Sequence, residues 1–378
     1  MEKHLHIITL NVPYPVDYGA VYDLFYKLPA LQQQGIKIHL HCFTKERSEQ
    51  PELNKFCEEV FYYNRNTGSK NLSSKLPYIV TSRTNDVLTK RLLQNDYPIL
   101  MEGIHCSYIT ADARFKNRKM FVRLHNVEHV YYEKLYEFSH HPKKKMYYWL
   151  ESKKLYRYEK KLCARINAFW CVAQQDADYY HKEFNCKNIF YLPLFIPPWK
   201  VESLEGMGSY CLYHGNLEIE ENEYAILWLL KNVFKHLEIP FVVAGKNPSK
   251  KIINAVKKYK NTTLIANPVE KQMHETILKA HIHVLPSFNT TGIKIKLLNA
   301  LYNGRHCVAN NSMIAETSLK DLCHVVDTAN EFKERIQLLY HQPFTTAEKT
   351  FRKNFLQTEF SNESNAEQIV NWIWKNLD

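Results

Sequence analysis

The chain of 378 residues carries 50 Lys and Arg against 39 Asp and Glu, a formal net charge of +11, with 45% hydrophobic and 24% charged residues. This composition is that of an ordinary globular protein and excludes a disordered or fibrous chain, while the length predicts two domains. The positive charge leaves several interpretations open: a nucleic-acid partner, an anionic membrane surface, a phosphate-rich substrate, or a lysine-rich surface without a special partner.

The first residues lack the segments of a signal peptide, and no run approaches the roughly 18 to 20 apolar residues that span a bilayer. We therefore expect a soluble, cytoplasmic protein. The nine cysteines are scattered, and Cys42, Cys171, Cys211 and Cys307 lie in apolar runs, which is typical of reduced core cysteines rather than of a disulfide framework. Because no two cysteines have a Cys-x-x-Cys spacing, we expect no zinc site.

Strand-like and helical runs alternate along the first half of the chain, which is typical of parallel sheets flanked by helices. Residues 4–12 predict a strand, residues 21–34 a helix, and residues 36–43 the next strand. Further strands are expected at residues 97–103 and 119–126, and each ends in polar residues. Because open α/β sheets bind ligands at the carboxyl ends of their strands, these polar residues are candidates for a site.

A long basic and aromatic segment, residues 142–165, predicts a helix that leads into another strand and then a helix. Residues 201–209 hold two of the ten glycines and predict a linker. The second half repeats the alternation, with strands expected at residues 210–216, 240–248, 262–269, 280–287 and 305–311 and helices at residues 225–237 and 293–304. We predict domains over residues 1–204 and 205–355, and a terminal helix within residues 356–378 that packs back toward the first domain.

The segment over residues 283–311 is the most informative in the chain. Thr290, Thr291 and Gly292 precede a helix, whose first backbone N–H groups can bind a phosphate. Lys294 and Lys296 lie in the first turn, where they can neutralise a diphosphate. The alternative is an ordinary capped helix with a solvated lysine face.

This segment resembles the donor-binding stretch of retaining GT-B glycosyltransferases of the family 4 type, in which a strand, Pro-Ser, a loop, a glycine and a helix follow one another. Gly292, Lys294, Lys296, Asn299 and Ala300 stand in register with a subset that reads Gly-x-Arg-x-Lys-x-x-Glu-Ala. The resemblance departs from the family at two positions: Thr291 and Asn299 stand where the family has two glutamates, the first near the transferred sugar and the second on the ribose hydroxyls. Neither replacement carries a charge, although both can hydrogen-bond hydroxyls.

The resemblance implies an α/β chain of GT-B fold, with two Rossmann-like, doubly wound domains facing a cleft, the first for the acceptor and the second for the donor. It implies that a sugar moves from a nucleotide diphosphate sugar, with UDP or GDP, to a saccharide or lipid-linked saccharide with retention, in bacterial surface polysaccharide synthesis. The nucleotide sugar is a co-substrate, and no cofactor is expected. The basic aromatic stretch around residues 143–161 leaves two interpretations open: peripheral contact with the inner membrane face, or a buried stripe with a solvated lysine face.

Further resemblances add donor-side candidates. Residues 212–234 are similar to the opening strand, glycine turn and helix of the family's donor domain, so Gly215 and Asn216 are expected at the nucleotide, with Gly245 and Lys246 near the base. Gly19 is expected close to the donor diphosphate or the acceptor. A plain turn is the other interpretation of each glycine.

The His-Asn-x-Glu segment of the family resembles residues 125–128. The resemblance implies that His125 contacts the donor sugar, that Asn126 lies on the acceptor side, and that Glu128 orders this loop there. Asp17 is expected near the acceptor.

The resemblance implies transfer without a metal. This agrees with the sequence, in which no acidic motif such as Asp-x-Asp is placed to hold Mg²⁺. Lys294 and Lys296 then stabilise the leaving diphosphate, Thr291 stands beside the sugar, and His125 positions it. Three alternatives stay open: a nucleotide-sugar 2-epimerase, a non-catalytic partner subunit, and a nucleic-acid-binding protein. The last rests on charge alone, and we expect no nucleic-acid partner.

Overall fold

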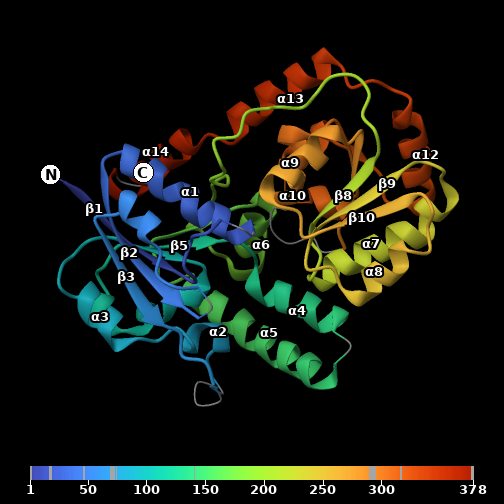
Figure 1. The fold of residues 1–378 in the computed structure, drawn as a ribbon. Coiled ribbons are helices and arrows are strands. Elements are labelled where there is room, and N and C mark those ends of the chain that lie inside the picture. Colours follow the sequence, from blue (N-terminus) through green and yellow to red (C-terminus); the bar gives the residue numbers. More distant parts are fainter. Residues whose placement is uncertain are drawn as a thin grey trace. The chain divides into compact units, whose positions relative to one another are not determined.

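The computed structural model describes residues 2–16, 19–45, 47–68, 73, 75–139, 141–288, 295–315 and 317–375 (Figure 1). The chain divides into two compact units, one formed by Met1–Pro197 with Phe360–Asp378 and the other by Pro198–Glu359. Each unit is built around one parallel β-sheet.

The first unit contains a seven-stranded sheet in the order β3-β2-β1-β4-β5-β6-β7. Its strands are β1 (Lys3–Thr9), β2 (Ile36–Thr44), β3 (Glu59–Asn64), β4 (Ile99–Glu102), β5 (Met120–Leu124), β6 (Ala168–Cys171) and β7 (Ile189–Tyr191). Its helices are α1 (Gly19–Gln33), α2 (Tyr78–Thr81), α3 (Asp86–Leu92), α4 (Glu128–Phe138), α5 (Pro142–Leu162), α6 (Gln174–Phe184) and α14 (Asn362–Trp374). The strand order reverses between β1 and β4. After β1 the chain continues toward one side of the sheet, and after β4 it continues toward the other side.

The first sheet has a hydrophobic core on each face. Successive residues of a strand belong to different cores, because side chains of a strand alternate between the faces of its sheet. On one face, Leu5 and Ile7 of β1 pack with α1 and α14; on the other, Ile8 packs with α2, α3, α5 and α6. The fully buried Trp170 of β6 stacks on Phe121 of β5 at 4.9 Å between ring centroids and on Trp372 of α14 at 5.5 Å. The helix α14 is therefore an integral part of the first unit.

The second unit contains a six-stranded sheet in the order β10-β9-β8-β11-β12-β13, which repeats the strand order of the first. Its strands are β8 (Cys211–Asn216), β9 (Phe241–Lys246), β10 (Thr262–Ala266), β11 (Ile282–Leu285), β12 (His306–Ala309) and β13 (His324–Val325). Its helices are α7 (Glu220–Asn232), α8 (Lys250–Val256), α9 (Glu270–Lys279), α10 (Ile295–Asn303), α11 (Asn311–Ile314), α12 (Ala329–Tyr340) and α13 (Thr346–Glu359).

Helices cover both faces of this second sheet, as right-handed connections between parallel strands require. The helices α7 and α8 lie on one face, and α9 and α10 on the other (Figure 1). Trp228 of α7 contacts Phe332 of α12 at 5.6 Å between ring centroids, so α12 lies beside α7. The strand order reverses between β8 and β11.

Most of the predicted elements are confirmed, with shorter strands than expected. The basic segment forms α5, and Cys42, Cys171, Cys211 and Cys307 are buried. The helix α7 begins already at Glu220, before its apolar run, because acidic residues favour the amino-terminal turn of a helix. The edge strand β3, whose burial is only partial, gives no clear pattern and was not predicted. Among the described residues, no helix combines the length and the apolar character that crossing a bilayer requires.

A directed chain of hydrogen bonds joins neutral histidines of β1 and β2. Arg91 donates to the Tyr63 hydroxyl at 2.7 Å, Tyr63 lies 2.9 Å from His41 Nδ1, and His41 Nε2 lies 2.9 Å from His6 Nδ1. His6 Nε2 completes the chain at 2.9 Å from the Asn95 side-chain oxygen. Burial lowers the pKa of His6 to about 4 and that of His41 well below its usual value. Each ring uses one nitrogen as donor and the other as acceptor, so protonation disrupts the chain.

We predict that the protein loses stability as the pH falls from about 6.5 toward 4. The pKa of His6 is lowered to about 4 in the folded state, so between these values the unfolded chain binds more protons than the folded one. His6 alone then contributes at most about 3 kcal/mol to the loss. Urea unfolding at pH 7 and pH 4.5 should show a smaller pH-dependent loss in His6→Gln than in the wild type. The control His181→Gln, at an exposed position of α6, should lose as much free energy of unfolding between pH 7 and pH 4.5 as the wild type. Equal losses in the wild type, His6→Gln and His181→Gln would contradict this account.

Candidate functional site

The carboxyl edge of the second sheet gathers most of the described donor-side candidates. β8 ends with Gly215 and Asn216, beside β9, which ends with Gly245 and Lys246. A Cβ on Gly245 would lie 1.9 Å from the Gly215 carbonyl oxygen, so this close approach of the two strands requires glycine. Gly215 has a φ of 156°, which side-chain-bearing residues rarely adopt. These glycines are thus explained by the backbone geometry where the neighbouring strands β8 and β9 end.

Lys296 reaches this edge from the first turn of α10. Its Nζ donates to the Tyr213 hydroxyl at 2.9 Å and to Asn222 Oδ1 at 2.6 Å. Tyr213 of β8 is fully buried, and burial raises the pKa of its hydroxyl well above the usual value, so the hydroxyl stays protonated and itself donates to Asn222 Oδ1 at 2.8 Å. Burial and the charge of Lys296 lower the pKa of His214 to about 3, which keeps this neighbour neutral.

The turn after β8 is held by side-chain amides. Asn216 Oδ1 accepts from the Glu218 backbone N–H at 3.1 Å, and the Asn216 carbonyl accepts from Asn222 Nδ2 at 2.8 Å. Asn222 therefore connects the turn to Lys296. The Lys246 side chain is exposed, while its carbonyl accepts from the Leu217 N–H at 2.8 Å.

The loop after β11 begins from a rigid anchor. The Asn310 side chain accepts from the Ser287 N–H at 2.9 Å and donates to the Ser287 carbonyl at 2.7 Å. The Ser287 hydroxyl donates to Glu221 Oε1 of α7 at 2.6 Å. Further along, Asn299 Oδ1 accepts from Asn303 Nδ2 at 2.8 Å on the half-buried side of α10.

Five predicted site residues lie outside the described residues. They are Asp17, Thr290, Thr291, Gly292 and Lys294. Their roles stay predictions.

The carboxyl edge of the first sheet is organised around Asp23, a fully buried residue of α1. Its carboxylate accepts two hydrogen bonds from Arg123, at 2.9 and 2.8 Å, one from Lys27 at 3.0 Å and one from the Phe195 N–H at 2.9 Å. Lys27 also donates to Glu102 Oε1 at 2.5 Å. Burial alone would raise the pKa of Asp23, but the charges of Arg123 and Lys27 hold it well below its usual value.

His125 follows β5 directly and joins this network. Its Nε2 lies 3.0 Å from Asp23 Oδ2 and 3.9 Å from Glu102 Oε2, and 12% of its side chain is exposed. Because the ionised Asp23 can only accept, the proton of the neutral ring is assigned to Nε2. Asp23 therefore fixes the ring of His125 in one orientation.

Asn126 and Glu128 follow at the start of α4. Burial, together with the nearby charge of Glu159, raises the pKa of Glu128 to about 8, so its carboxyl is largely protonated at pH 7. The Glu159 carboxylate accepts from the backbone N–H groups of Glu128 and His129 at 2.9 and 3.2 Å, which anchors the first turn of α4. Gly19 is the first residue of α1.

Two groups of described side chains have the composition of a metal site, and one of them is Asp23, Glu102 and His125. Lys27 and Arg123 already balance the two carboxylates, so the four charges sum to zero. A cation would have to displace the Lys27 amino group. This group is therefore an ion-pair network rather than a metal centre.

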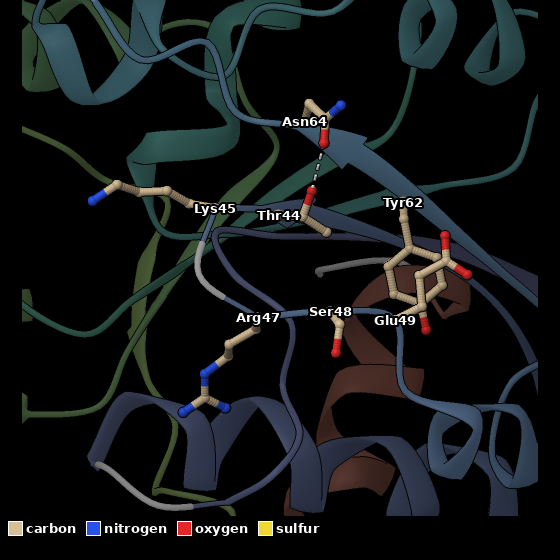
Figure 2. A pocket seen from close by; sticks show the side chains of 7 residues that line it. All are labelled: Thr44, Lys45, Arg47, Ser48, Glu49, Tyr62 and Asn64. Atoms are coloured by element: carbon tan, nitrogen blue, oxygen red, sulfur yellow. Dashed lines mark hydrogen bonds between the residues drawn. The ribbon is translucent and has the colours of Figure 1, made fainter.

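A polar pocket of about 510 Å³ lies where β2 and β3 end. Figure 2 shows its lining and the 3.1 Å hydrogen bond from the Thr44 hydroxyl to the Asn64 side-chain oxygen. Arg47 donates to the Pro15 carbonyl at 2.6 Å, which connects the pocket to the loop before α1. The lining residues are Thr44, Lys45, Arg47, Ser48, Glu49, Tyr62 and Asn64.

Sequence reasoning missed the residues that hold His125 and Lys296 in place. Glu102 and Arg123 could have been noticed, because each is a charged residue inside a short apolar strand. Tyr213 and Asn222 carried no such signal.

The comparisons with known proteins agree with this architecture. Residues 208–342 match the family model described as Glycosyl transferases group 1. The chain is 26% identical over 326 residues to an uncharacterized 44.6 kDa protein in the cps region of Klebsiella pneumoniae, which covers 81% of this chain and 82% of that protein.

Many solved structures resemble the whole chain, and two of them serve as examples. Sucrose-phosphate synthase from Thermosynechococcus elongatus aligns with a TM-score of 0.70 at 13% identity, over 98% of both chains. A mutant of S. aureus TarM in complex with Fondaparinux, alpha-GlcNAc-glycerol and UDP aligns with a TM-score of 0.67 at 10% identity, over 99% of this chain and 100% of that chain. The fold is therefore GT-B, and the comparisons support a glycosyltransferase.

Proposed function

We propose that this protein transfers a sugar from a UDP- or GDP-sugar to a saccharide or lipid-linked saccharide acceptor, with retention, in the assembly of a bacterial surface polysaccharide. The observation that carries the proposal is the position of Lys296, held by Tyr213 and Asn222 where the strand order of the second sheet reverses. The segment matched by Glycosyl transferases group 1 contains this site. The cps-region relative supports the polysaccharide role.

Lys296 supplies positive charge where the leaving diphosphate gains negative charge. Breaking the bond from the anomeric carbon to the diphosphate leaves both electrons on the diphosphate oxygen, and the acceptor hydroxyl oxygen bonds the anomeric carbon. The acceptor proton ends on the released diphosphate or in solvent. A fixed cation favours this charge development because it needs no reorganisation during the reaction. Tyr213 and Asn222 hold the amino group in this way.

We further propose that the transfer needs no metal ion. In place of a metal ion, Lys296 neutralises the negative charge of the diphosphate, together with Lys294 and the amino-terminal end of α10. The charge balance among Asp23, Glu102, Lys27 and Arg123 supports this view for the first unit.

We propose that His125 positions the donor sugar, while Glu128 and Asn126 shape the following loop on the acceptor side. A carboxyl group that is protonated at pH 7 can donate a hydrogen bond to a sugar oxygen, and Glu128 has the raised pKa that this requires. The polar pocket beyond β2 and β3 offers hydroxyl and charged groups of the kind that bind saccharide hydroxyls.

A nucleotide-binding partner subunit without turnover is the second candidate. One observation favours it: the Asn299 side-chain oxygen, placed where the family has a ribose-binding glutamate, is already used by Asn303. Such a protein would bind a nucleotide yet transfer no sugar from any donor.

We expect one of UDP, GDP, ADP and CDP to raise the thermal midpoint by several degrees without added metal. Lys296→Met should weaken this nucleotide's binding by about 10- to 100-fold in calorimetry, because a hydrogen bond to a charged group contributes about 1.5 to 3 kcal/mol. Lys279→Ala, an exposed lysine of α9, is the matched control and should bind like the wild type. Unchanged affinity in folded Lys296→Met would contradict the proposed donor site.

Replacing His125 should affect transfer more than nucleotide binding. In His125→Ala we expect kcat/KM to fall by about 100-fold or more, since misplacing the sugar costs on this order. The dissociation constant of the nucleoside diphosphate should stay within about threefold, which is ~0.6 kcal/mol. His181→Ala serves as the control in steady-state assays. A similar loss of nucleotide affinity and of transfer would argue that His125 has only a structural role.

We also propose that α5 lies on an anionic membrane surface when the acceptor is lipid-linked. Met146, Trp149 and Leu150 are 62%, 49% and 44% exposed, and Lys143 and Lys144 are exposed beside them. Apolar side chains flanked by lysines suit an anionic lipid surface.

In vesicle sedimentation, we expect binding to vesicles that contain phosphatidylglycerol, little binding to phosphatidylcholine vesicles, and weaker binding at high salt. Trp149→Glu should reduce binding, whereas Phe351→Glu, at an exposed aromatic residue of α13, should not. Equal binding of both variants would rule out α5 as the contact.

A further inference from the structure

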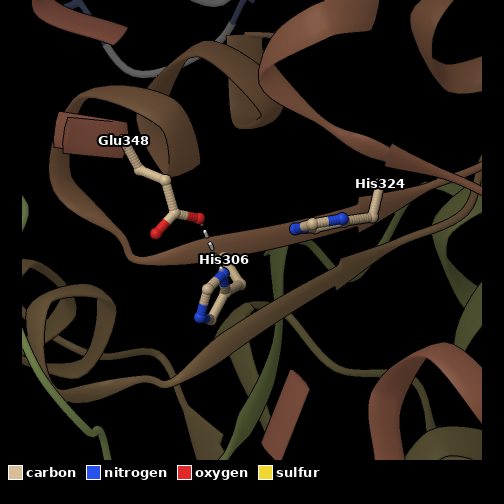
Figure 3. Close-up of side chains that lie close together, drawn as sticks. All are labelled: His306, His324 and Glu348. Atoms are coloured by element: carbon tan, nitrogen blue, oxygen red, sulfur yellow. Dashed lines mark ion pairs between the residues drawn. The ribbon is translucent and has the colours of Figure 1, made fainter. Parts of the chain in front are cut away.

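Three side chains with metal-ligating atoms gather at the amino edge of the second sheet (Figure 3). His306 opens β12, His324 opens β13, and Glu348 lies in the first turn of α13. In a parallel sheet, this edge is opposite the one where Gly215 and Asn216 end β8. The cluster is therefore separate from the proposed donor site.

The strand register directs the two histidines to one face of the sheet. Val308 of β12 pairs with His324 of β13, and His306 shares the face of Val308 because side chains alternate along a strand. The two imidazole centroids are 5.7 Å apart. One ligand atom from each of His306, His324 and Glu348 can be chosen so that all lie within 4.8 Å of one another.

His306 leaves a nitrogen lone pair inside this cluster. Its Nε2 lies 3.0 Å from the Gln342 carbonyl oxygen, which can only accept, so Nε2 carries the proton of the neutral ring. Nδ1 is buried, makes no hydrogen bond with the described residues, and lies 3.6 Å from Glu348 Oε1. Two electron-rich atoms thus face one another unless a cation lies between them.

The carboxylate of Glu348 is held in place by the start of α13. Its Oε2 accepts from the Thr345 N–H at 2.8 Å and from the Thr345 hydroxyl at 2.7 Å, which directs Oε1 toward His306. Arg352, one turn along α13, donates to the carbonyls of Leu301, Gly304 and Arg305. The guanidinium is thus engaged by backbone oxygens.

We propose that His306 Nδ1, His324 and Glu348 bind a zinc ion, with water as a fourth ligand. Two imidazoles and a carboxylate are a usual zinc ligand set, whereas Mg²⁺ and Ca²⁺ prefer oxygen ligands alone. The bond from His306 Nε2–H to a backbone carbonyl is the outer-shell contact that typically orients a zinc-binding histidine. The ion would connect β12, β13 and α13 and stabilise the second unit.

The test uses the full chain, freed of metal by dialysis against a chelator. Zinc titration by calorimetry should show one such site per chain, and zinc should raise the thermal midpoint by several degrees. His324→Gln and Glu348→Gln should each weaken zinc binding at least about tenfold, since each removes one ligand. Nucleotide binding by both variants should be unchanged, which separates this proposal from the proposed function.

His274→Gln is the matched control, because His274 is an exposed histidine of the same unit with its own carboxylate partner, Glu202, at 3.2 Å. It should bind zinc like the wild type. Equal zinc affinity in His324→Gln, Glu348→Gln and His274→Gln would overturn the proposal. Sulfur-to-metal charge-transfer absorption after Co²⁺ loading would also overturn it, because it would identify cysteine ligands instead.

Discussion

In a parallel sheet all strands end at one edge, and both sheets of this protein reverse their strand order after the third strand from one side. This constraint decides where polar groups can meet. In the first unit it brings Glu102 and His125 to the end of the sheet near Asp23 of α1. In the second it brings β8 beside β11, and Lys296 of α10 reaches Tyr213 of β8.

Buried charge is compensated differently in the two units. Around Asp23, two carboxylates and two cations cancel within a buried cluster, and removing one partner of such a cluster typically costs several kcal/mol. At Lys296 the ammonium donates to the Tyr213 hydroxyl and to Asn222 Oδ1, and burial together with this positive charge lowers the pKa of His214. The first arrangement fixes geometry without net charge. The second places an ammonium group at the edge of the sheet, which suits the proposed recognition of a diphosphate.

The sequence predicted the fold well because buried parallel strands are mostly local apolar runs, as in β9 and β11. It predicted Lys296 at the start of a helix but not its partners, since Tyr213 and Asn222 lie 83 and 74 residues away along the chain. The same holds for Asp23 and Arg123, which are 100 residues apart. No local pattern encodes such pairs. The sequence led us to expect no zinc site, and it gave no sign of the cluster of His306, His324 and Glu348, because these residues come from three separate elements.

The most direct test of the central claim is a transfer reaction followed by nuclear magnetic resonance, with the purified chain, a panel of nucleotide sugars and saccharide acceptors. The account predicts that one donor releases its nucleoside diphosphate in equal amount to a new glycosidic bond, with the anomeric configuration of the donor. Donor consumption with inversion would contradict retention. Donor epimerisation without an acceptor product, or nucleotide binding with no new glycosidic bond from any donor, would contradict glycosyl transfer itself.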